Sequence, residues 1–261
     1  MGKIISFINQ KGGVGKTTTC VNVASYMASF GKKVLIFDID PQGNATSNVG
    51  IEKKDGIKTI YNAIVGDCNI NDVVQHTKFN NLDIIPADVD LAGAEIELVR
   101  MNNREKIVKN LIDTIKDNYD YICIDCPPSL GLITINSLTA SDSVIIPIQC
   151  EYFALEGLTQ LMYTIKLVKK HLNPSIDVEG VVLTMKDNRS NLGISVANDL
   201  HQYFKEKVYE TVIPRNVRLA EAPSFGEPID HYDSRCTGAK AYKQLTLEIL
   251  KKNKDEVKLD K

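Results

Sequence analysis

Residues 4–18, IISFINQKGGVGKTT, place two lysines, three glycines and two threonines directly behind a short apolar run. Glycines let the backbone N–H groups curve inward around oxyanions, and a helix that follows adds free N–H groups and the positive end of its dipole. Lys16 can reach the β- and γ-phosphates of a nucleotide, and the Thr17 hydroxyl can ligate Mg²⁺. The stretch therefore predicts a nucleoside triphosphate site in which Lys16 acts on the phosphates. The expected binding residues are Lys11, Gly12, Gly13, Val14, Gly15, Lys16, Thr17 and Thr18.

Two more apolar runs end in carboxylates. Asp38 and Asp40 lie two residues apart at the end of one run, so both side chains leave the same side of a strand. Asp125 closes the run 121–125. At the carboxyl edge of a parallel sheet these acids would lie beside the phosphates. We therefore expect Asp38 and Asp125, together with Thr17, to hold Mg²⁺, and a carboxylate of this group to orient the attacking water.

Short β-branched runs alternate with helix-length periodic segments along the chain. Most of the runs are apolar on both faces, which is typical of a parallel sheet covered on both sides. The sequence therefore predicts an α/β fold with a doubly wound, mostly parallel sheet and helices on both faces. The expected strands span 3–9, 33–39, 82–86, 121–125, 143–148, 178–184 and 209–213. The expected helices span 17–30, 90–101, 104–118, 132–140, 155–172, 194–207 and 238–251.

The composition fits one domain over residues 1–261, because 43% of the residues are hydrophobic and can form a large core. A charged tail from about residue 252 is expected to fray. The net charge of −2 excludes a globally basic nucleic-acid binder, although a local basic patch remains compatible with it. No apolar run is long enough to span a membrane. Six cysteines without framework spacing indicate reduced thiols and a cytoplasmic protein.

The glycine-rich loop departs from the general phosphate-loop pattern, since Gln10 stands where that pattern has a glycine and Lys11 adds a second lysine. Residues 11–17, KGGVGKT, resemble the deviant Walker A motif of the ParA/MinD ATPases, which are P-loop NTPases of the SIMIBI type. The segments FDIDPQGNAT, QCEYFALEG and TVIPRNVRLAEAP resemble strings of ParA proteins. The resemblance runs from about residue 3 to residue 250 and is to the Soj-type ParA chromosome-partitioning ATPases.

This resemblance implies an ATP-hydrolysing enzyme that uses ATP and Mg²⁺. It makes Asp40 the residue that activates water, and it assigns Asp38 to support of the metal and the loop. Lys11 is expected to cross the interface of a homodimer that forms with ATP, and to neutralise charge on the partner's nucleotide. Glu151 is expected near that interface, where it can meet the partner's Lys11. The base pocket is expected to contain Met185, Pro214 and Asn216.

Soj-type ParA proteins bind double-stranded DNA without sequence preference when they dimerise, through contacts from lysine and arginine to phosphates. The candidates here are Arg189, Arg218, Arg235, Lys240 and Lys243. The resemblance also implies a ParB-type centromere-binding partner that accelerates hydrolysis, and association with the nucleoid in the ATP-bound state. The implied function is an ATP-dependent switch in chromosome or plasmid segregation.

Three alternatives use the same loop. A MinD-like membrane-positioning ATPase needs an amphipathic C-terminal helix, and residues 251–261 offer only Val257 and Leu259 as apolar side chains. An iron–sulfur scaffold or nitrogenase-reductase-like ATPase needs cysteines at the dimer interface, for which Cys126 is the nearest candidate. A biosynthetic synthetase or amidotransferase needs a substrate pocket that no motif of the chain identifies.

Overall fold

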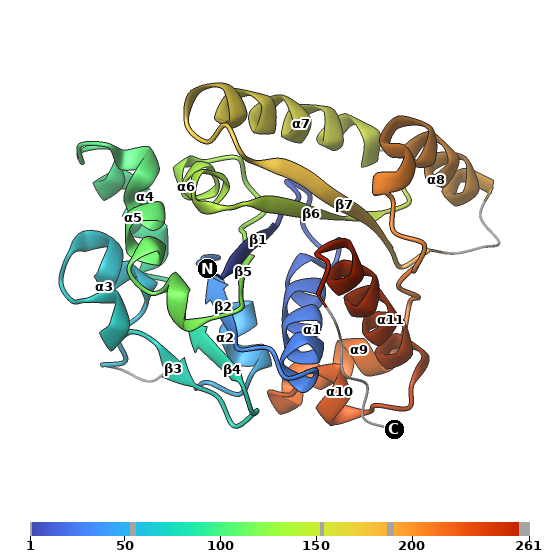
Figure 1. Ribbon diagram of the computed structural model, residues 1–261, viewed down its shortest axis with the longest axis horizontal. Coiled ribbons are helices and arrows are strands. Elements are labelled where there is room, and N and C mark those ends of the chain that lie inside the picture. Colours follow the sequence, from blue (N-terminus) through green and yellow to red (C-terminus); the bar gives the residue numbers. More distant parts are fainter. Residues whose placement is uncertain (1, 53–55, 152–153, 187–190, 256–261) are drawn as a thin grey trace.

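The computed structural model describes residues 2–52, 56–151, 154–186 and 191–255. Its centre is a seven-stranded sheet with the order β3-β4-β2-β5-β1-β6-β7, seen in Figure 1 between two layers of helices. All neighbours pair in parallel except β3, which runs antiparallel to β4. The strands are β1 (Lys3–Phe7), β2 (Val34–Asp38), β3 (Gln75–His76), β4 (Leu82–Ile85), β5 (Tyr121–Asp125), β6 (Ser143–Gln149) and β7 (Asp177–Thr184). The predicted doubly wound α/β class is therefore confirmed.

The helices fall into two layers, one on each face of the sheet (Figure 1). One apolar cluster packs the helices from α3 to α8 against the sheet, and a second packs α1 and α11 against the opposite face. The helices are α1 (Lys16–Ser29), α2 (Asn44–Asn48), α3 (Ile60–Val65), α4 (Leu91–Leu98), α5 (Ile107–Asp113), α6 (Leu132–Ala140), α7 (Ala154–His171), α8 (Asn191–Phe204), α9 (Val217–Glu221), α10 (Ile229–Tyr232) and α11 (Thr237–Lys252).

Strand register fixes the position of the predicted carboxylates. In the parallel pairing of β1 with β5, Phe7 lies opposite Asp125, and in the pairing of β2 with β5, Asp38 lies opposite the same residue. The glycine-rich loop leaves β1 directly after Phe7. The ends of three neighbouring strands thus bring the loop and both acids to one edge of the sheet, as the rule for parallel α/β sheets predicts.

The expected strand over 209–213 is wrong. This segment forms no ladder with β7: it is flanked by two isolated bridges, Val181 with Val208 and Thr184 with Ile213, and the Tyr209 N–H donates to the Val181 carbonyl at 2.9 Å. Between them, the backbone N–H groups of Glu210 and Thr211 donate to the two carboxylate oxygens of Glu248, at 3.0 and 3.1 Å. Because a side chain takes the backbone donors that a ladder needs, no continuous strand forms.

Other differences concern short elements. The helix expected over 104–118 is divided into α5 and two flanking 3-10 turns, Arg104–Lys106 and Lys116–Asn118. The short elements β3, α2, α3, α9 and α10 were not expected from the sequence. Each spans two to six residues, too few for a hydrophobic period to show.

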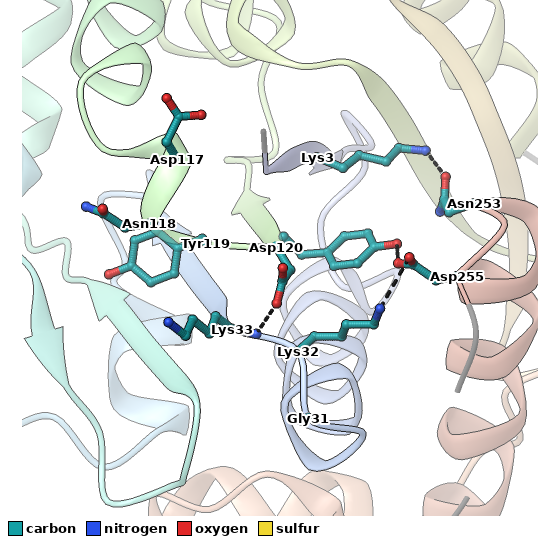
Figure 2. Close-up of a pocket in the computed structure, with 11 residues that line it drawn as sticks. Lys3, Gly31, Lys32, Lys33, Asp117, Asn118, Tyr119, Asp120, Asn253 and Asp255 are labelled. Carbon is teal, nitrogen blue, oxygen red and sulfur yellow. Dashed lines mark hydrogen bonds and ion pairs between the residues drawn. The ribbon is translucent and has the colours of Figure 1, made fainter. Parts of the chain in front are cut away.

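The C-terminal tail is attached at its start. A cavity of about 510 Å³ lies at the amino-terminal ends of β1, β2 and β5, at the opposite end of the sheet from the glycine-rich loop. At its rim Asp255 accepts a hydrogen bond from the Tyr121 hydroxyl at 2.5 Å and pairs with Lys32 at 3.2 Å (Figure 2). The chain therefore stays anchored as far as Asp255, beyond residue 252 where fraying was expected, and residues 256–261 lie outside the described part.

Candidate functional site

The glycine-rich loop between β1 and α1 has the backbone shape that its glycines allow. Gly13 and Gly15 have φ values of 73° and 86°, in the left-handed region that side chains disfavour. Gly15 caps the N-terminus of α1, and the hydroxyl of Thr184 donates to the Val14 carbonyl at 2.8 Å, which fixes the loop against β7. The free N–H groups at the start of α1 therefore face the loop, as phosphate binding requires.

Lys16 is only 6% exposed. Its ammonium group donates to the Lys11 carbonyl across the loop at 3.1 Å. Burial lowers the pKa of Lys16, while the negative charges of Asp125 and Asp40 oppose that shift. The lysine is thus a buried cation between the loop and the carboxylates, where phosphate charge would stabilise it further.

Asp125 is completely buried, and neither carboxylate oxygen has a hydrogen-bond partner among the described residues. Burial, followed by the charge of Asp38, raises the pKa of Asp125 well above its usual range; the neighbouring Thr17 and Lys16 offset part of the rise. An unpartnered buried carboxylate is costly, and a cation shell relieves that cost. Asp125 and the Thr17 hydroxyl therefore fit a hydrated Mg²⁺ ion carried by a nucleotide.

Asp38, the second predicted metal residue, is also completely buried but is well hydrogen-bonded. Its Oδ2 accepts from the backbone N–H and the hydroxyl of Thr46, at 2.8 and 2.7 Å, and its Oδ1 accepts from the Asp40 N–H at 3.2 Å. Burial raises the pKa of Asp38 to about 6 against these hydrogen bonds. The protein donors leave Asp38 less free than Asp125 to serve a metal shell, and they identify Thr46 as a residue that the sequence motifs did not single out.

Asp40 lies at the wall of a cavity of about 440 Å³ and is 6% exposed. Its Oδ1 accepts from the Gln42 N–H at 3.0 Å, which orients the carboxylate. The same cavity contains predicted residues of the loop and of the base pocket, with others that were not expected. Its lining includes Gly12, Gly13, Gly15, Lys16, Thr17, Thr18, Asp40, Met185, Pro214, Asn216, Leu219 and Tyr242. The structure thus brings the loop, the proposed water-orienting acid and the base-side residues to one cavity.

Met185 and Asn216, two residues of the predicted base pocket, differ in backbone conformation and in hydrogen bonding. Met185 has a φ of 50°, a strained value for a side chain other than glycine, and its N–H donates to the Ile213 carbonyl at 2.7 Å. The amide of Asn216 is engaged: Oδ1 caps α9 by accepting from the Arg218 N–H, and Nδ2 donates to Thr237. Because the amide nitrogen carries two hydrogens and the amide oxygen two lone pairs, each atom can make one further hydrogen bond, such as the contact to a base that the resemblance implies.

Two lining residues, Leu219 and Tyr242, were missed by sequence reasoning. Tyr242 lies on the buried face of α11, and its hydroxyl is 3.2 Å from the Thr19 hydroxyl of α1. A tyrosine in an apolar helical stripe carries no local sign of a ligand site. Only the packing of α11 against α1 brings it to the cavity.

Lys11 lies beside this cavity and not in its lining. Its ammonium group pairs with the Glu151 carboxylate of the same chain at 2.5 Å, with 36% and 48% of the two side chains exposed. The family resemblance implied that both residues lie near a dimer interface, where Glu151 can meet the partner's Lys11. In the structure the two residues meet within one subunit.

The candidate DNA-binding residues are exposed where they are described. Lys240 and Lys243 share one face of α11, and Arg235 lies just before that helix. Arg218, on α9, pairs with Glu221 at 2.9 Å and with Asp233 at 3.5 Å. Arg189 lies outside the described residues. Four of the five basic residues thus fall on neighbouring elements.

Relatives were found at the level of sequence. A family model described as an AAA domain matches residues 2–178. The chain is 59% identical to the sporulation initiation inhibitor protein Soj of Bacillus subtilis over 249 residues, which cover 95% of this chain and 98% of that protein. It is 49% identical to the chromosome partitioning protein ParA of Myxococcus xanthus, with 97% and 89% covered. This chain belongs to the ParA/Soj family of ATPases.

Solved structures of the wider superfamily have the same fold as this ParA/Soj chain. A plasmid partition protein of Borrelia burgdorferi bound to AMPPNP has a TM-score of 0.82 at 26% identity, covering 97% of this chain and all of that one. The cobyrinic acid a,c-diamide synthase of Mycobacterium smegmatis, with ADP and magnesium, has a TM-score of 0.84 at 30% identity, covering both chains completely. The predicted family and the predicted ATPase class with ATP and Mg²⁺ agree with these relatives.

One further observation bears on the iron–sulfur alternative, and another concerns membrane spans. Cys126 is completely buried, and burial raises the pKa of its thiol, whereas an interfacial iron–sulfur ligand must reach the surface as a thiolate. Across the described helices, none has both the length and the apolar character that crossing a membrane requires.

Proposed function

We propose that this ParA/Soj ATPase is an ATP-dependent switch in chromosome or plasmid segregation, active as a dimer on DNA. The observation that carries the proposal is the cavity that joins the glycine-rich loop to Asp40, Met185 and Pro214. Thr17 of its lining neighbours Asp125, whose carboxylate has no hydrogen-bond partner among the described residues. The Soj and ParA relatives support the segregation role.

In this proposal the loop amides and Lys16 hold the β- and γ-phosphates, while Thr17 and Asp125 hold the Mg²⁺ shell. Bound Mg²⁺ would neutralise phosphate charge as it develops. Asp38, held by Thr46, keeps the second strand end against the loop. Pro214 and Met185 pack against the base on the far side of the cavity. Of the side chains named, Lys16, Thr17, Pro214 and Met185 line the cavity.

Asp40 orients the attacking water. Its carboxylate lies at the cavity wall, where the hydrogen bond from the Gln42 N–H to Oδ1 orients it toward a water molecule in the cavity. Turnover without a partner is expected to be slow, because a switch needs a lasting ATP-bound state.

Two subunits then close face to face, with each Lys11 leaving Glu151 to contact the partner's nucleotide. The closed dimer presents two copies of the basic surface formed by Arg218, Arg235, Lys240 and Lys243. Doubling modest phosphate contacts makes binding depend on dimerisation and fall steeply with salt. A ParB-type protein is the proposed stimulating partner, and the ATP-bound form is proposed to associate with the nucleoid.

The test is binding to random-sequence duplex DNA with ATP or ADP at two salt concentrations, with Lys16→Ala as the control that cannot use ATP. The proposal expects binding that requires ATP, weakens at least tenfold at the higher salt and is absent in the control. Equal binding with ATP and ADP, or no binding with either, overturns it. Flotation with anionic lipid vesicles would then test the MinD-like alternative.

A further inference from the structure

Helix α4 is apolar on two faces, although it lies at the periphery of the molecule (Figure 1). Leu91, Ala94 and Leu98 are buried in the core. On the other side, Ile96 is 67% exposed, and Val89 and Val99, at the two ends of the helix, are 74% and 58% exposed. A surface helix normally shows charged or polar residues on its outer face, so these side chains need an explanation.

The exposed residues form a continuous stripe. Val89, Ala92, Ile96 and Val99 follow one another at spacings of three, four and three residues, which is the a/d pattern by which one helix packs against another. Helical hydrogen bonds continue on both sides of α4, from the Ala92 N–H to the Val89 carbonyl and from the Val99 N–H to the Glu95 carbonyl. The four side chains therefore share one side of the helix.

The charge around this stripe indicates what covers it. Among residues 86–101, Asp88, Asp90 and Glu97 stand against Arg100, a net charge of −2 once Glu95, which packs against Gly131, is left aside. Arg104, which donates to the Val99 carbonyl, is paired with Glu105. A second copy of the same surface would bring like charges together, which opposes self-association. A basic amphipathic helix matches both the apolar stripe and its acidic border.

The amino-terminal end of this region is connected to Asp38 through Thr46. The Ala87 N–H donates to the Thr46 hydroxyl oxygen at 3.0 Å, and the same hydroxyl donates to Asp38 at 2.7 Å. Ala87 and Thr46 are both buried. A displacement of the segment before α4 therefore changes the hydrogen bonding of Asp38.

The helix itself contacts the segment that follows Asp125. The Glu95 carboxylate accepts from the Ile133 N–H at 3.5 Å, at the start of α6. It also lies so close to Gly131 that a Cβ atom there would come within 2.2 Å of its Oε1. The turn between Asp125 and α6 is thus packed directly against α4.

We propose that the stripe of Val89, Ala92, Ile96 and Val99 is a docking surface for a basic amphipathic helix of a partner protein, whose binding alters ATP hydrolysis through Thr46 and Glu95. This inference deepens the proposed function and rests on it for the existence of a stimulating partner. The apolar stripe supplies the affinity, and the acidic border selects a partner of positive charge. Thr46 connects the surface to Asp38, and Glu95 connects it to the turn that follows Asp125.

The test uses two synthetic helical peptides with the same leucines at a and d positions, one with lysine and one with glutamate at the remaining positions. Binding to the full-length protein is measured by fluorescence anisotropy for the unmodified chain, for Ile96→Ser/Val99→Ser and for Tyr203→Ser. Tyr203 is a matched control, because it is 61% exposed on α8. The lysine peptide should bind the unmodified chain and the Tyr203→Ser control with equal affinity. It should bind both at least tenfold more tightly than the glutamate peptide does. Its affinity for the double variant should be at least tenfold lower.

A charge variant tests the border independently of the stripe. Asp90 is exposed, and Asp90→Lys should lower the affinity for the lysine peptide and raise the affinity for the glutamate peptide. Saturating lysine peptide should also change kcat at least twofold in the unmodified chain and not in the double variant. Equal binding by the double variant and the control overturns the docking surface, and binding without a change in kcat overturns the connection to the site. ATP-dependent DNA binding, measured in parallel, reports separately on the proposed function.

Discussion

The Lys11 ammonium and the Glu151 carboxylate form an ion pair of 2.5 Å within one subunit. If Lys11 serves the partner's nucleotide, it must first leave Glu151, so the pair opposes dimerisation. Because both side chains are more than a third exposed, the pair contributes at most about 1 kcal/mol. Its effect on a dimerisation equilibrium is therefore modest but measurable.

Glu151→Gln should strengthen the proposed ATP-dependent dimer by up to roughly 25-fold, because each of the two subunits gives up a pair of at most about 1 kcal/mol and 1.4 kcal/mol corresponds to tenfold. Sedimentation velocity over a range of protein concentrations measures the change. Glu105→Gln, which removes a similar exposed pair with Arg104, is the control. A weaker dimer in Glu151→Gln would instead favour a contact of Glu151 across the interface.

Asp40→Ala should bind ATP and dimerise but hydrolyse ATP roughly 100-fold or more slowly, because a positioned base typically contributes 10²–10⁴-fold. Single-turnover hydrolysis and nucleotide affinity, measured together, separate chemistry from binding. Lys16→Ala should lose nucleotide binding itself. Full turnover by Asp40→Ala would remove this residue from the mechanism.

Asp125→Asn should stabilise the nucleotide-free protein against unfolding. It should also reduce the further stabilisation that Mg²⁺-ATP provides. The substitution removes a buried charge that has no hydrogen-bond partner among the described residues, and an effect of about 1–3 kcal/mol is expected. Thermal unfolding with EDTA and with Mg²⁺-ATP measures both effects. A variant that is destabilised in EDTA, or that gains as much as the unmodified chain from Mg²⁺-ATP, contradicts this account of Asp125.

The nucleotide-free protein should lose stability as the pH rises above about 4. The folded pKa of Asp38 is raised to about 6 and that of Asp125 is raised well above its usual value, so the native state binds more protons than the unfolded chain, whose carboxyls titrate near 4. The contribution of this pair is fully present below pH 4 and is lost as the pH rises through the folded pKa values. Unfolding in EDTA at pH 5.5 and 7.5 checks the sign, and Asp125→Asn should show the smaller difference.

Thr46→Val should impair catalysis by releasing one side of the Asp38 carboxylate. The loss of a hydrogen bond to a charged group corresponds to about 1.5–3 kcal/mol, or roughly tenfold or more in kcat, with a higher Mg²⁺ concentration at half-maximal rate. Thr46→Ser keeps the hydroxyl and is the matched control. If the two variants depend on Mg²⁺ in the same way, Thr46 has only a packing role.

Short sequence motifs were enough to predict the candidate site residues, because most of these residues lie at or just after the ends of strands. Gly13, Gly15 and Lys16 follow β1 directly, and Asp38 and Asp125 close two strands, so strand register alone brings them together. Sequence could not show that Thr46 links Asp38 to Ala87, or that Tyr242 lies beside Thr19. Those contacts join residues 41 and 223 positions apart and depend on how the layers pack.

The segment 209–213 shows the same limit in the fold. Its β-branched residues Thr211, Val212 and Ile213 are typical of a strand, yet its N–H groups at positions 210 and 211 donate to Glu248 of α11. A distant side chain therefore overrides a local β pattern. Helix α4 shows a related limit. The a/d spacing from Val89 to Val99 can be read from the sequence, but the structure is needed to show that these side chains are exposed.

The central claim, that ATP hydrolysis ends a DNA-bound state, is tested most directly by comparing two rates. Release from random-sequence duplex DNA is followed by stopped flow after mixing the ATP-bound protein with excess competitor DNA, alongside single-turnover hydrolysis under the same conditions. The account predicts that Asp40→Ala slows release and hydrolysis by the same factor. Unchanged release from DNA in a variant that no longer hydrolyses ATP would contradict it.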